Sequence, residues 1–110
     1  MTVEFEIEGQ RFVALNGGPH FKFNEAVSFI IDCQTQDDID YYWEHLTADG
    51  GQEQMCGWLK DKYGVSWQVI PLILNDMIKD EDKEKSGRAV EAMLKMKKLD
   101  IAALQKAYQG

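Results

Sequence analysis

The N-terminal part of the chain alternates apolar and polar residues in the way that is typical of β-strands. Residues 2–7 place Val3, Phe5 and Ile7 on one side and threonine or glutamate on the other. This period of two predicts a half-buried strand. Residues 11–15 predict its return strand, so that residues 2–15 form a β-hairpin.

The pattern changes between residues 27 and 51. Residues 27–33 are rich in β-branched side chains and predict a third strand. Thr35 then provides a helix cap, and Gly50 and Gly51 end the helix. Its apolar stripe has the spacing i, i+3, i+4, i+7 and consists of Ile39, Tyr42, Trp43 and Leu46.

Two further strands are predicted at residues 54–60 and 65–70, joined by a turn. Gly57, inside the first of them, indicates a bulge or a close approach by another part of the chain. The remaining residues predict helices over residues 72–79, 80–97 and 100–108. The order indicates an α+β fold with one five-stranded sheet and helices at one end. Its open edges and broad apolar face predict a homodimer.

Composition and charge narrow the possible partners. A chain of 110 residues with 45% hydrophobic content forms one domain with a real core. The net charge of −7 disfavours nucleic acid and anionic membranes as partners.

No apolar run approaches the roughly 20 residues of a membrane span, and the first residues do not resemble a signal peptide. The two cysteines form no metal-binding spacing, so we expect reduced thiols in a cytoplasmic protein.

Residues 14–29, ALNGGPHFKFNEAVSF, join two strands through a polar and glycine-rich connection. Glycine and proline make residues 16–19 a strong turn signal. After it, His20 and Asn24 alternate with Phe21 and Phe23, which makes this connection a candidate wall of a ligand pocket.

This segment also carries a resemblance. With residues 37–46, 56–71 and 96–108 it is similar to the PhnB-like, or 3-demethylubiquinone-9 3-methyltransferase-like, family of the vicinal-oxygen-chelate superfamily. The resemblance implies the fold of glyoxalase, bleomycin-resistance and dioxygenase proteins, in which a βαβββ module occurs twice. It implies one domain over residues 1–110. It also implies that residues 26–71 form the second module and that residues 72–110 add C-terminal helices. By the same resemblance, residues 2–15 are expected to be the remnant of an incomplete first module, either because the chain is truncated or because it is a natural short form that a partner completes.

The resemblance does not extend to the metal ligands of the superfamily. The position of a ligand histidine holds Ala26, and the motif D-x-x-G-x-x-x-E, which starts here at Asp61, ends in Gln68. A divalent ion needs anionic or imidazole ligands, so we expect no metal. We expect no cofactor either, because the turn at Gly17 and Gly18 leads into a strand and not into the helix of a nucleotide-binding fold.

A sheet-lined cavity for a small organic molecule remains the main hypothesis. The residues predicted to bind this ligand are His20, Phe21, Phe23, Asn24, Trp58, Trp67 and Gln68. His20 and Cys56 are the candidates for any catalysis, although Cys56 can equally be an inert buried thiol and the tryptophans can be core residues. Two alternatives stay open: a non-catalytic structural homodimer, and a metal-dependent lyase or dioxygenase whose missing segment completes the site. The sequence leaves open whether the protein is an enzyme.

Overall fold

Two separate β-sheets organise the chain in the computed structural model, which describes residues 1–110. The first sheet is an antiparallel hairpin of β1 (Thr2–Ile7) and β2 (Gln10–Leu15). The second has the strand order β3-β6-β5-β4. Its strands are β3 (Ser28–Cys33), β4 (Gln52–Glu53), β5 (Trp58–Lys60) and β6 (Ser66–Pro71). The α+β class is confirmed, and the prediction of one five-stranded sheet is wrong.

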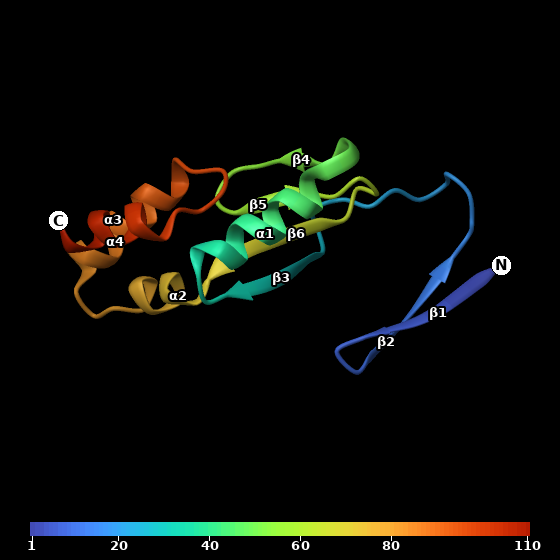
Figure 1. Cartoon of the computed structure of the whole chain (residues 1–110), viewed down its shortest axis with the longest axis horizontal. Helices are drawn as coiled ribbons and strands as arrows, with labels where there is room; N and C mark the ends of the chain where they lie inside the picture. Colours follow the sequence, from blue (N-terminus) through green and yellow to red (C-terminus); the bar gives the residue numbers. More distant parts are fainter.

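The hairpin lies apart from the rest of the molecule, at the opposite end from the C-terminal helices (Figure 1). Residues 16–27 connect it to β3 without regular structure. The expected single sheet does not form, because β1 and β2 pair only with each other and the connection holds them away from β3. The molecule is therefore 54 Å long, with a radius of gyration of 16.3 Å, whereas a compact chain of this length would have a radius of about 13 Å.

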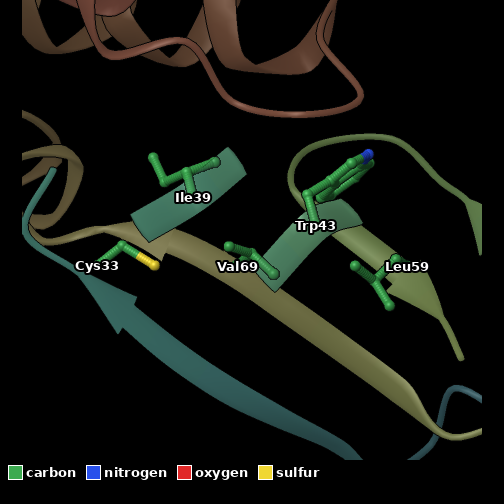
Figure 2. Packing of buried hydrophobic residues seen from close by; sticks show 5 residues of the cluster. All are labelled: Cys33, Ile39, Trp43, Leu59 and Val69. Atoms are coloured by element: carbon green, nitrogen blue, oxygen red, sulfur yellow. The ribbon is translucent and has the colours of Figure 1, made fainter. Parts of the chain in front are cut away.

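Helix α1 (Gln36–Thr47) covers one face of the four-stranded sheet and continues into the short 3₁₀ turn η1 (Ala48–Gly50). The predicted cap is confirmed, because the hydroxyl of Thr35 accepts the N–H of Asp38 at 3.1 Å. The first core lies between α1 and the sheet (Figure 2) and consists of Cys33, Ile39, Trp43, Leu59 and Val69. Burying side chains of this size stabilises the fold by about 1.5–3 kcal/mol each.

Three helices build a second core at the end of the sheet: α2 (Leu72–Ile78), α3 (Lys83–Leu94) and α4 (Ile101–Gln109). The core consists of Leu74, Met77, Ala89, Leu99 and Leu104. Helix α3 is shorter than predicted because the carboxylate of Asp82 accepts the N–H groups of Glu84 and Lys85, so the helix starts there. Arg88 donates to the carbonyls of Ala107 and Tyr108 and so holds the last turn of α4.

The predicted strand at residues 54–60 is interrupted, and only its last part pairs as β5. Cys56 and Gly57 have φ angles of +62° and +82° and form the central residues of a tight turn between β4 and β5, closed by the N–H of Trp58 donating to the carbonyl of Met55 at 3.1 Å. The N–H groups of Cys56 and Gly57 donate to the carbonyls of Met96 and Lys97 at 2.7 and 2.8 Å. Of the two predictions for Gly57, a bulge or a close approach, the close approach is confirmed, and the approaching segment is the one before α4. No helix of the chain is long and apolar enough to cross a membrane.

Candidate ligand groove

The face of the four-stranded sheet that α1 leaves uncovered contains a groove of about 370 Å³. The sheet contributes its floor, and the C-terminal helices close one end. The lining residues are Ile30, Asp32, Cys56, Trp58, Gln68, Ile70, Leu74, Asn75, Ile78 and Met93. Seven of these ten side chains are hydrophobic, and the volume is at the lower end of the range for small-molecule sites.

Strand register explains why these residues meet. Gln68 on the central strand β6 lies opposite Ile30 on β3 and opposite Trp58 on β5. Successive side chains of a strand point to opposite faces, so these three residues form one row across the uncovered face. Asp32 and Ile70 are also paired in register and continue the same face towards α2.

The polar groups of the groove are mainly hydrogen-bond acceptors. Asp32 is exposed and is the only charged residue of the lining, and its side chain forms no ion pair or hydrogen bond within the chain. Gln68 donates its amide N–H to the hydroxyl of Ser28 at 2.9 Å, which leaves its carbonyl oxygen available. The side chain of Asn75 has no partner in the chain and provides both an oxygen and an NH₂ group.

The two cysteines lie in different environments. Cys56 is half-buried and lines the groove, whereas Cys33 is buried on the α1 side of the sheet. Burial, with smaller contributions from Asp38 and Asp32, raises the pKa of the Cys33 thiol to about 11. His20 is exposed in the connection between the hairpin and β3 and does not line the groove with Cys56. The structure therefore does not bring the two catalytic candidates into one site.

Trp67 also lies outside the groove. It is paired with Leu59 and Phe29, so it shares the α1 side of the sheet with the first core. Its indole N–H donates to the carboxylate of Asp61 at 3.0 Å. The expectation that Trp58 and Trp67 line one cavity is wrong, because their register places them on opposite faces.

Phe23 and Asn24 line a second hollow of about 300 Å³, together with Lys22, Val27, Phe29, Val65 and Ser66. Phe21 belongs to neither hollow and is 95% exposed. Of the seven predicted ligand-binding residues, the structure thus places only Trp58 and Gln68 in the groove. Ser66 is almost completely buried, and its hydroxyl has no partner in the chain.

Sequence reasoning missed several lining residues. Asp32 and Ile30 could have been found from the sequence, because they alternate with the core positions of the predicted strand at residues 27–33 and so share its mixed face. Asn75 and Met93 could not, since they reach the groove only through the packing of α2 and α3. No group of three or more His, Cys, Asp or Glu side chains is arranged to hold a metal ion.

These features define a class of protein: an α+β domain whose mixed sheet is covered by one helix and carries a groove on its other face. Residues 1–70 match the family model described as 3-demethylubiquinone-9 3-methyltransferase. The chain therefore belongs to this family, and its resemblance to PhnB-like proteins is confirmed.

A solved structure from Bacillus cereus supports the same assignment. It is a PhnB protein with a provisional designation as a 3-demethylubiquinone-9 3-methyltransferase, and it is 32% identical with a TM-score of 0.57. The match covers 64% of this chain and 64% of the Bacillus protein, so the chain spans less than two thirds of that relative. Among the curated proteins, no match was found.

Proposed function

We propose that this PhnB-like chain binds a small organic molecule, without a metal, in the groove on the uncovered face of its sheet. The observation that carries the proposal is the groove itself: an apolar hollow of about 370 Å³ with an aromatic side chain and three polar ones. Such a combination is typical of ligand sites, where apolar walls provide affinity and a few polar groups orient the ligand.

We also propose that two copies of the chain associate through the hairpin. Val3, Phe5 and Ile7 form the apolar side of β1 and are 57%, 45% and 52% exposed. Phe5 stacks on Phe12, and Phe12 meets Phe29 of the sheet edge-on at 6.1 Å, which is the main aromatic link to the rest of the chain. An isolated hairpin is marginally stable, so a second copy that covers it would stabilise the chain.

In this proposal residues 1–110 act as one domain. Residues 26–71 provide the floor of the groove, residues 72–110 provide its end wall, and residues 2–15 provide the contact between copies. The two free cysteines fit a reducing compartment, so we place the protein in the cytoplasm.

The proposal contains no methyl transfer, although the family carries that name. Gly17 and Gly18 precede an irregular connection and then β3, whereas a nucleotide-type cofactor needs a glycine-rich turn into the N-terminus of a helix.

A ligand screen by NMR tests the binding proposal directly. The ¹⁵N-labelled full chain is titrated with a set of small aromatic and polar compounds, and the shifted amide and indole signals are mapped onto the structure. We expect them to cluster at Ile30, Trp58 and Gln68, and Trp58→Ala to weaken binding at least about tenfold by removing an aromatic contact. Tyr41→Ala, on the exposed side of α1, serves as the control. Shifts that cluster elsewhere contradict the proposal.

A further inference from the structure

We propose that the groove selects an organic cation, namely a primary ammonium group attached to an apolar or aromatic body. This inference rests on the proposed function of the groove and names the class of ligand that it would take. It comes from the charge and the hydrogen-bonding capacity of the lining residues.

The charge of the groove is negative and uncompensated. Asp32 is the only charged residue of the lining, and no basic side chain pairs with it. Lys60 shares the uncovered face by strand alternation, but it pairs with Glu25. The whole chain carries a net charge of −7, so its long-range field also attracts cations.

The hydrogen-bonding groups match an ammonium. An ammonium has three donors and no acceptor. The groove provides the carboxylate of Asp32, the free carbonyl oxygen of Gln68 and the amide oxygen of Asn75. An anionic ligand would instead meet the Asp32 carboxylate at close range, and the lining contains no basic side chain to pair with it.

The apolar part of the groove accommodates the body of the ligand. Trp58 lies in register with Gln68, next to the polar row, and indole is the aromatic ring that attracts cations most strongly. Ile30, Ile70 and Met93 supply the remaining apolar wall. A phenyl or short alkyl group attached to the ammonium therefore fits both the chemistry and the size of the groove.

Three probes that share a phenethyl group test the inference: phenethylammonium, the neutral 2-phenylethanol and the anionic 3-phenylpropanoate. Each is titrated into the ¹⁵N-labelled full chain, in the assembly that it forms in solution, while the three indole signals are followed. We expect phenethylammonium to shift the signal of Trp58, whereas the indole N–H groups of Trp43 and Trp67 are bound to Glu53 and Asp61 and serve as internal references. We expect the alcohol to bind about tenfold more weakly, because it carries no positive charge to pair with the carboxylate of Asp32.

Asp32→Asn removes the charge and keeps the shape of the side chain. We expect it to weaken phenethylammonium binding about tenfold and to leave the affinity for the alcohol unchanged. Glu44→Gln is the matched control, since it removes one negative charge from the exposed α1 on the opposite side of the sheet. Asp32→Glu keeps the charge and should retain the preference for the cation. Thermal unfolding of each variant checks that the fold is intact.

The outcomes separate the inference from the proposed function. If the alcohol binds Trp58 as tightly as the cation, or if Asp32→Asn leaves cation binding intact, the groove binds small molecules without selecting a cation and the inference fails alone. If the anion binds best, the inference fails in the same way. If none of the three probes shifts Trp58 at millimolar concentration, both the inference and the proposed groove fail.

Discussion

The turn at Gly57 joins the sheet to the C-terminal helices, and replacing Gly57 by alanine tests how much stability depends on this junction. The residue has a φ angle of +82°. Its N–H donates to the carbonyl of Lys97, and its own carbonyl accepts the N–H of Val69, both at 2.8 Å. A Cβ atom at this position would lie 2.9 Å from Cδ1 of Leu99 and 3.0 Å from the carbonyl oxygen of Val69.

Two costs add in the alanine variant. A side chain at a left-handed φ costs about 1–2 kcal/mol. The overlap costs a further ~1–3 kcal/mol, as in other overpacked sites. Leu99 and Val69 are both completely buried and cannot move away freely. We therefore expect the free energy of unfolding to fall by about 3 kcal/mol and the melting temperature by roughly 15 °C.

Two other glycines separate these costs. Gly64 has a φ angle of +89°, but its added Cβ would meet only Cβ of Phe23 at an ordinary 3.8 Å. Gly64→Ala should therefore cost only the strain, about 1–2 kcal/mol. Gly87 lies in α3 with open space around it, so Gly87→Ala should stabilise the chain by up to about 1 kcal/mol.

Urea unfolding followed by tryptophan fluorescence measures all three variants, because Trp43, Trp58 and Trp67 all lie in the part of the chain that contains both cores. Equal slopes against urea concentration are required for the comparison. If Gly57→Ala is no less stable than Gly64→Ala, the overlap costs nothing, and the described junction between sheet and helices is wrong.

Four further predictions concern other parts of the chain. The pKa of Cys33 is raised by burial from an ordinary 9.0 to about 11, so its contribution to stability is complete below pH 9 and is lost as the pH rises towards 11; melting curves of Cys33→Ala should show a weaker fall over that range, and equal curves would refute this. Iodoacetamide at pH 8 should modify Cys56 before Cys33, as peptide mass spectrometry can show; the reverse order would contradict the burial of Cys33. Phe5→Asp should shift sedimentation equilibrium towards single chains while the melting of the two cores is kept, whereas an unchanged mass would exclude the hairpin as the contact. Asp82→Ala should cost about 1 kcal/mol in urea unfolding through loss of the α3 cap, and an unchanged midpoint would show that the cap does not stabilise α3.

Local patterns in the sequence predicted most of the secondary structure. The hairpin, the third strand and the capped helix after Thr35 all depend on neighbouring residues, and all are found in the structure. Strand boundaries were less accurate where a distant segment intervenes. The pairing of the Cys56 and Gly57 amides with residues 96–97 interrupts the strand expected at residues 54–60.

The candidate site was predicted only in part, because a ligand groove depends on which distant segments meet. Alternation tells which residues of one strand share a face, but only the pairing between strands shows that Trp58 joins Gln68 while Trp67 faces α1. Likewise, no local pattern indicates that Asn75 and Met93 close the groove.

The sequence by itself determined the secondary-structure elements of this protein, because backbone propensity, capping and periodicity act over a few residues. The net charge and the resemblance to a family are also properties of the sequence alone. The tertiary structure alone decided that the hairpin leaves the main sheet, which face of that sheet stays uncovered, and that Asp32 lies unpaired in the groove. Those properties follow from contacts between residues far apart in the chain, and such contacts are set by packing as a whole.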